Sequence, residues 1–89
     1  MAQEPARIIW SAESVGRFKE LGHRTRDQIL KRVALLERMP MLFQVEPDGR
    51  WAGLRRFRSR SVIVFYTYWH ENHPVYIEAI VPRRSDRSE

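Results

Sequence analysis

The sequence predicts an α+β protein in which an antiparallel pair of helices packs on one face of an antiparallel sheet of three or four strands, with a short strand at the N-terminus. Two observations indicate this class. Apolar residues recur at helical spacing between Ser11 and Pro40, whereas β-branched and aromatic residues form short runs separated by turns from Leu54 onward. With 89 residues, of which 43% are hydrophobic, the chain suits a single domain spanning residues 1–89.

Residues 7–10 form a short β-prone run, which we expect to be the first strand. Ser11 follows as a helix N-cap, because its hydroxyl can accept a hydrogen bond from an exposed backbone N–H. Gly22 can close the first helix in the left-handed conformation. Between these two residues, apolar positions recur at helical spacing: Val15, Phe18 and Leu21.

A second helix is expected to begin at Thr25. The pattern T-R-D-Q allows Thr25 and Gln28 to satisfy each other's exposed N–H groups. Pro40 ends this helix. Because only a few residues link the two helices, we expect a hairpin. The core-facing stripe, widened by Leu30 and Ala34, consists of Ile29, Val33 and Leu36.

A loop with a turn at 47–49 leads to a meander of three strands. The strands are expected at 54–58, 62–69 and 75–81. The middle strand is apolar on both faces, as a central strand should be. Alternation in the last strand places Val75, Ile77, Ala79 and Val81 on one side. The tail, about 83–89, has no apolar group to dock and should be flexible.

Charge is the feature that points toward function. The formal net charge is +5, and 14 of the 16 basic residues are Arg, whose planar fork binds carboxylates and phosphates in pairs. No acidic residue occurs from Gly49 to His70. Alternation places Phe57 on one sheet face and Arg56 and Arg58 on the other.

Further basic residues lie near these two arginines in the expected sheet. Arg60 occupies the turn, and Arg83 and Arg84 follow the last strand, so the folded sheet can gather them into one positive patch. Such a patch suits phosphates or acidic side chains. The alternative interpretation is a set of solvated surface charges.

Several function classes find no support. Without cysteine there is no disulfide or thiolate chemistry, and we find no Ser-His-Asp arrangement, P-loop or dinucleotide turn. His70 and His73 lack a third ligand at a known spacing, so we expect no metal and no cofactor. The N-terminus is no signal peptide and no run reaches ~18 apolar residues, so we expect a cytoplasmic protein with no membrane partner.

Aromatic residues end the central strand, in the order Phe65, Tyr66, Tyr68 and Trp69. Such a run can stack nucleic-acid bases. On a central strand, however, at least half of it is expected to belong to the core.

The patterns GLRRF, VIVFY and VYIEAIVPRRSD, in this order after two helices, resemble the RelE/ParE superfamily of bacterial type II toxins, and within it the ParE branch. The resemblance extends from about Arg7 to Asp86. It implies the RelE/ParE-like toxin fold and a growth-inhibiting toxin encoded beside an antitoxin. The extended C-terminal segment of that antitoxin would wrap around the toxin and neutralise it.

The superfamily has two principal activities. ParE-like members block DNA gyrase, whereas RelE-like members cut messenger RNA on the ribosome. The third strand of RelE-like proteins typically reads YRVIY, with the Arg helping to hold the scissile phosphate, but the matching stretch here is VIVFY at 62–66. RNA cleavage also needs an acid, a base or strong charge stabilisation, and after Val81 the chain has no Tyr or His.

The resemblance therefore favours a non-enzymatic, protein-binding toxin that inhibits DNA gyrase. Its residues for recognition of target or antitoxin would be Arg55, Arg56, Arg58, Arg60, Arg83 and Arg84. The alternative is a ribosome-dependent mRNA endoribonuclease whose phosphate contacts would be Arg56, Arg58, Arg60 and Arg83. A third possibility is a member that binds an antitoxin-like partner but is no longer toxic.

The chain departs from the ParE pattern at three places. Arg58 and Arg60 stand where the turn usually carries Pro and Gly, Pro82 replaces a His after the last strand, and the tail stops early. Arg60 can therefore take the place of the missing strand arginine, which leaves the target open.

Overall fold

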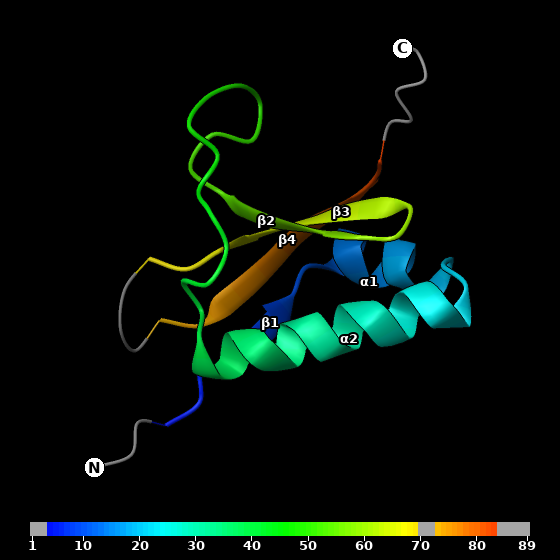
Figure 1. Ribbon diagram of the computed structural model, residues 1–89, viewed down its shortest axis with the longest axis horizontal. Coiled ribbons are helices and arrows are strands. Elements are labelled where there is room, and N and C mark those ends of the chain that lie inside the picture. Colours follow the sequence, from blue (N-terminus) through cyan, green and yellow to red (C-terminus); the bar gives the residue numbers. More distant parts are fainter. Residues whose placement is uncertain (1–3, 70–72, 84–89) are drawn as a thin grey trace.

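The computed structural model describes residues 4–69 and 73–83, which contain two helices and four strands (Figure 1). In chain order these are β1 (Ile8–Trp10), α1 (Ala12–Lys19), α2 (His23–Arg38), β2 (Arg55–Ser59), β3 (Val62–Thr67) and β4 (Val75–Pro82). Both helices lie on the same side of the sheet (Figure 1), so the predicted α+β class is confirmed. Within the described ranges, no helix is long and apolar enough to cross a membrane.

The strands form one sheet in the order β1-β4-β3-β2. β2, β3 and β4 are antiparallel neighbours, as the meander predicts, with Phe57 opposite Val64. The N-terminal strand β1 runs parallel to β4, with Ile8 opposite Val75, so the sheet is mixed. A parallel pair needs a long crossover connection. The two helices and the β2–β3 hairpin together supply it.

The main core lies between α2 and the sheet face that it covers. Ile29, Val33 and Leu36 are at most 6% exposed, which confirms the predicted stripe. The sheet contributes Phe57, Val64, Tyr66, Val75, Ile77 and Ile80. Each such side chain stabilises the fold by about 1.5–3 kcal/mol on burial. Leu30 is 47% exposed and Ala34 is also exposed, so widening the stripe to these residues was wrong.

The N-terminus of α1 lies where the sequence predicts it, whereas the N-terminus of α2 does not. The backbone N–H of Ser14 donates to the Ser11 side-chain oxygen at 3.0 Å, so the predicted cap of α1 is confirmed. α2 begins at His23, with Gly22 as its N-cap at φ −67°, and Thr25 lies buried inside the first turn. The capping role predicted for Thr25 and the left-handed Gly22 were therefore wrong. The tight connection from α1 lets the helix start earlier, where Thr25 serves packing instead of capping.

A bulge changes which side chains of β4 face the core. Phe65 pairs with Ala79 and Tyr66 pairs with Ile77, so Glu78 is an extra residue in β4. Beyond this point the alternation is reversed. Ile80 joins the core beside Val64, whereas Ala79 faces away from the helices. The prediction that Ala79 and Val81 share a side with Ile77 was therefore wrong, since Val81 pairs with Ile63 and lies on the same side as Ala79.

Candidate functional site

The β2–β3 hairpin presents Arg56 and Arg58 on the sheet face opposite the helices. Phe57, between them, is 3% exposed and belongs to the core. Since side chains alternate along a strand, its two neighbours point the other way. Across the hairpin, Arg56 lies opposite Phe65 and Arg58 lies opposite Ile63.

The turn of the hairpin adds a third guanidinium group. Arg60 and Ser61 connect the strands, and Arg60 adopts a φ of 55°, the only non-glycine residue among the described ones in the left-handed region. That conformation costs an ordinary residue roughly 1–2 kcal/mol. The Arg60 side chain is exposed at the tip. A strained residue with a free charged group at an exposed tip is typical of a functional position.

Arg83 meets this turn from the end of β4. Its backbone N–H donates to the Ser61 carbonyl oxygen at 2.7 Å, which ties it to the hairpin tip. Arg58, Arg60 and Arg83 are all exposed. We call these three residues the tip cluster. In the described part of the chain, no carboxylate lies within 4.0 Å of their guanidinium nitrogens.

Arg55 does not join the tip cluster. It shares the core side of β2 with Phe57, two residues on, and its Nη1 donates to the carbonyl oxygens of Phe43 at 2.6 Å and Met41 at 3.4 Å. The loop that follows α2 is held to the sheet by these bonds. Arg55 therefore has a structural task that the sequence interpretation did not assign.

Arg56 lies with Arg58 on the sheet face opposite the helices, called here the open face. Arg56, however, already has a partner. Its Nε lies 2.8 Å from a Glu46 carboxylate oxygen. Sequence reasoning missed this because Glu46 lies outside the acid-free stretch. The signal was present in the turn at 47–49, which folds the chain back: Gly53 N–H donates to the Glu46 carbonyl oxygen at 2.9 Å.

The same loop covers part of the open face with an aromatic side chain. The Trp51 ring stacks on Phe65, with centroids 4.3 Å apart and planes inclined by 13°, and the Arg50 guanidinium lies 5.0 Å from the Trp51 ring centroid. Phe65 is consequently only 2% exposed although it faces away from the helices. In Figure 1 the loop rises from the end of α2, beside the sheet, toward this far side.

The remaining aromatic residues divide between core and surface, as expected for a central strand. Tyr66 is fully buried and Tyr68 is partly buried, whereas Trp69 is 67% exposed. Burial raises the pKa of the Tyr66 hydroxyl above its ordinary value of 10.0, against the smaller lowering effects of the Phe43 backbone and the Arg55 charge.

Three sequence predictions concern residues outside the described ranges, namely those for His70, for Arg84 and for the tail after residue 83. Within the described ranges, no three side chains of His, Cys, Asp or Glu are grouped so as to hold a metal ion.

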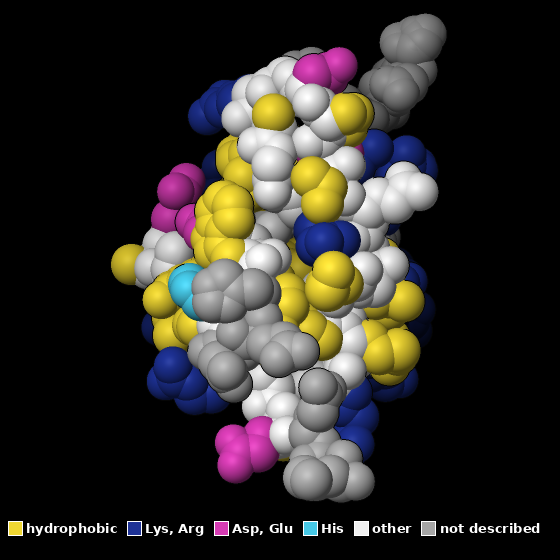
Figure 2. Space-filling model, turned by 90° about the vertical axis from the view of Figure 1, so that its left-hand side faces the viewer, with side chains coloured by type: hydrophobic (Ala, Val, Ile, Leu, Met, Phe, Trp, Pro, Cys, Tyr) yellow, Lys and Arg dark blue, Asp and Glu magenta, His cyan; other side chains and the backbone are white. Residues whose placement is uncertain are grey.

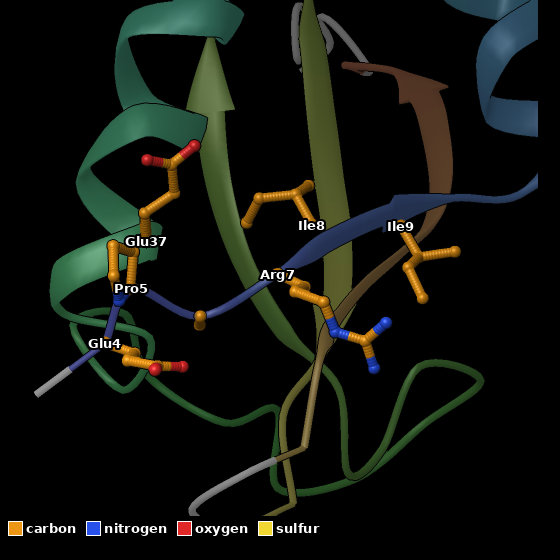
Figure 3. A pocket seen from close by; sticks show the side chains of 7 residues that line it. Glu4, Pro5, Arg7, Ile8, Ile9 and Glu37 are labelled. Atoms are coloured by element: carbon orange, nitrogen blue, oxygen red, sulfur yellow. The ribbon is translucent and has the colours of Figure 1, made fainter.

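A shallow hollow beside β1 is lined by Arg7 but by none of the arginines predicted for the functional site. Figure 3 shows it between the N-terminal segment and the end of α2. Its lining includes two carboxylates, Glu4 and Glu37, which makes it unsuited to an anionic ligand.

Comparison with known proteins gives a consistent result. The family profile described as the ParE toxin of the type II toxin–antitoxin system parDE matches residues 8–87. Sequence comparison with curated proteins gives no match.

Solved structures with the same fold include chains of two toxin–antitoxin complexes and one toxin. The toxin-antitoxin complex RelBE of E. coli contains a chain that superposes with a TM-score of 0.74 at 13% identity, covering 90% of this chain and 99% of that one. The RelBE2 complex of Mycobacterium tuberculosis gives 0.75 at 16% identity, covering 94% and 98%. The YoeB/ParE toxin of Agrobacterium tumefaciens gives 0.69 at 15% identity, covering 88% and 99%. At such low identity the likeness shows the fold alone.

Proposed function

Because the chain belongs to the ParE toxin family of type II toxin–antitoxin systems, we propose that it arrests growth by binding DNA gyrase through the tip cluster, and that a cognate antitoxin neutralises it. Both partners would meet it in the cytoplasm. The observation that carries the target assignment is the make-up of the cluster, since its three members are all arginines. A guanidinium stays protonated in proteins, so it can bind an anionic surface but cannot accept a proton.

The position of Ile63 supports a binding role over a cleaving one. It lies on the open face opposite Arg58, at the place where the resemblance to RelE-like enzymes would call for an arginine on the scissile phosphate. An apolar side chain there leaves that position of the central strand without a charge to hold RNA. An acidic protein surface at the hairpin tip needs no such charge.

Supercoiling of relaxed plasmid by purified gyrase tests the proposal. The wild-type chain should inhibit it, and the triple variant Arg58→Ala/Arg60→Ala/Arg83→Ala should need a roughly tenfold higher concentration. A control with the same loss of charge is Arg7→Ala/Arg17→Ala/Arg38→Ala, whose arginines are exposed elsewhere. Equal inhibition by both triple variants would contradict the role of the tip cluster, and no inhibition by the wild type would contradict gyrase as the target.

A ribosome-dependent mRNA endoribonuclease remains the second candidate, favoured by one observation. When Arg56 leaves its ion pair with Glu46, four arginines are available as phosphate contacts. Arg56 and Arg58 lie on the open face, and Arg60 and Arg83 lie at the hairpin tip. Primer extension on messages from a translation extract tests it. New 5′ ends that require ribosomes, and that vanish in Arg→Ala variants at these positions, would establish this activity in place of gyrase inhibition.

Support for an antitoxin partner comes from the relatives. Two of the similar solved structures are toxin–antitoxin complexes. Induced expression of the chain should arrest growth, and co-expression of the antitoxin from the adjacent reading frame should restore it. Expression without growth arrest would instead favour a member that has lost its toxicity.

A further inference from the structure

Ser61, in the β2–β3 turn, has a hydroxyl group that the fold does not use. It is the one exposed serine or threonine among residues 4–69 and 73–83, and within these ranges its side chain forms no hydrogen bond. The other hydroxyl groups in this part of the chain serve the fold, because Thr25 is buried and the rest form hydrogen bonds. The hydrogen-bonded ones belong to Ser11, Ser14, Ser59 and Thr67.

The register of the sheet brings Ser61 and Arg83 to the same side. Ile63 pairs with Val81 on the open face, and Ser61 and Arg83 each lie two residues further along the ladder. Alternation therefore places both side chains on the open face as well. The Arg83 N–H donates to the Ser61 carbonyl oxygen at 2.7 Å, so the two residues lie opposite each other. The Cβ atoms of such a pair are about 4.5–5.5 Å apart, which a long side chain easily spans.

Two more guanidinium groups flank Ser61. Arg60 precedes it in the turn, and Arg58 lies on the open face opposite Ile63, the second residue after Ser61. Arg58 is therefore a diagonal neighbour of Ser61, again within reach of a long side chain. These arginines and Arg83 are the tip cluster, which has no carboxylate within 4.0 Å in the described part of the chain. The Ser61 hydroxyl thus lies among three positive charges without a counterion.

A phosphate group on Ser61 would supply the missing counterion. Phosphoserine carries a charge of roughly −1.5 to −2 at pH 7 and has three acceptor oxygens. The planar guanidinium group binds phosphate oxygens in pairs. A phosphate placed beside an arginine cluster gains one to three charge-assisted hydrogen bonds, which compete with contacts from the same arginines to another molecule.

We propose that Ser61 is a phosphorylation site, and that the phosphate, once attached, is bound by the tip cluster of the same molecule and so withdraws these arginines from their target. The inference rests on the proposed function, since it assumes that the tip cluster binds the target. The phosphate donor is a nucleoside triphosphate. The catalyst is a serine kinase with an acidic substrate groove, because Arg58 and Arg60 lie three residues and one residue before Ser61.

The transfer step is an ordinary phosphoryl transfer. The Ser61 Oγ forms a bond to the γ-phosphorus, and the bond between that phosphorus and the bridging oxygen breaks. The nucleoside diphosphate leaves, and the hydroxyl proton passes to a base of the kinase.

The added charge is confined to one end of the molecule. The β2–β3 turn lies at the right of Figure 1, and Figure 2 shows the opposite end, where hydrophobic side chains gather. Phosphorylation at Ser61 therefore changes the arginine surface and leaves the apolar end of the molecule as it is.

Incorporation of phosphate tests the site directly. The full-length chain is incubated with ATP and a purified serine kinase that selects arginine before the serine, and peptide mass spectrometry locates the phosphate. We expect phosphate on Ser61, and Ser61→Ala should lose this product. Phosphorylation of the wild-type chain at other positions but not at Ser61 would overturn the proposal.

Binding of the phosphate by the cluster is tested on a chain with phosphoserine encoded at position 61. Nearby positive charges favour the dianion, so a ³¹P NMR titration should give a second phosphate pKa about 1 unit or more below that of the same chain unfolded in urea. Arg58→Ala/Arg83→Ala in the phosphorylated chain should remove most of this difference. Equal pKa values in the folded and unfolded chains would show that the cluster does not hold the phosphate.

Gyrase inhibition tests the regulatory effect. Phosphoserine at position 61 should raise the concentration needed for half-inhibition roughly tenfold. Phosphoserine at position 52 is the control with the same charge, because Ala52 is exposed and the whole length of β2 separates it from the turn. It should change inhibition by about twofold at most. Equal inhibition by the two phosphorylated chains would overturn the regulatory role. Failure of the unmodified chain to inhibit gyrase would contradict the proposed function instead, whereas the NMR titration tests the phosphate site independently of gyrase.

Discussion

Glu46 holds Arg56 in an ion pair at 2.8 Å across the open face of the sheet. The pair connects the loop after α2 to β2 and occupies Arg56, which lies two residues before Arg58 of the tip cluster. Both side chains are partly exposed, at 24% and 40%. An incoming anionic group can therefore compete with the Glu46 carboxylate.

Replacing Glu46 with Gln should strengthen target binding. Removing the carboxylate leaves Arg56 available to the target, and the concentration needed for half-inhibition of gyrase should fall a few-fold. The free energy of unfolding should change by less than about 1 kcal/mol, since a partly exposed ion pair contributes little. Glu20→Gln is the control, because it removes a carboxylate that lies 3.9 Å from Arg17 at the end of α1 and not beside the hairpin. Unchanged or weaker inhibition by Glu46→Gln would show that Arg56 plays no part.

Arg60→Gly should make the protein more stable and less active. Glycine relieves the cost of the φ of 55°, although it adds entropy to the unfolded chain, and the net gain should be about 0.5–1 kcal/mol. Thermal melts should show a rise of a few degrees. Arg60→Ala also removes the guanidinium but keeps the strain, so it should lose activity without the gain in stability. A lower melting temperature for Arg60→Gly would contradict the assigned strain.

Trp51→Ala should lower the free energy of unfolding, because the Trp51 ring packs on the open face of the sheet. The substitution removes the ring that covers Phe65 and should cost about 2 kcal/mol, from lost burial and ring stacking together. Urea unfolding measures the change. Trp69→Ala provides the comparison, because Trp69 is 67% exposed and its loss should cost less than about 0.5 kcal/mol. Equal losses of unfolding free energy in the two variants would mean that the stacking of Trp51 on Phe65 contributes nothing to stability.

Tyr66 should make stability fall at alkaline pH. Burial raises its pKa in the folded protein above 10.0, so the unfolded chain loses the proton first as the pH rises. The stabilisation is complete below pH ~10 and is lost as the pH passes through the folded pKa. Tyr66→Phe should remove this part of the pH dependence and cost about 1 kcal/mol at neutral pH, because the bond to Pro40 is lost. Tyr76→Phe, at a residue 38% exposed, should leave the free energy of unfolding at neutral pH unchanged.

The spacing of apolar and polar residues in the sequence correctly predicted the features that depend only on residues close together in the chain. The Ser11 cap, the stripe of α2 and the alternation around Phe57 all follow from local spacing, and each is present. The same alternation could have separated Arg55 from Arg56, because Arg55 lies two residues from the buried Phe57. Grouping every arginine by proximity in sequence concealed this signal.

Features that depend on distant residues could not be predicted from local spacing. The partner of Arg56 comes from a loop, and its approach depends on how the turn at 47–49 folds back. The extra residue Glu78 reverses the faces of β4, and the only mark of it in the sequence is that the apolar alternation breaks at Ala79, Ile80 and Val81, which are consecutive. The parallel pairing of β1 depends on residues at the opposite end of the chain.

That pairing has a consequence for biosynthesis. β4 lies between β1 and β3 but is made after both, and its first residue, Val75, donates a backbone hydrogen bond to Arg7, just before β1. Contacts so remote in sequence form late in folding. The nascent polypeptide therefore cannot complete its sheet, or bring Arg83 to the hairpin tip, until β4 has been made. A chain that lacks β4 therefore also lacks the surface that Arg58, Arg60 and Arg83 form together.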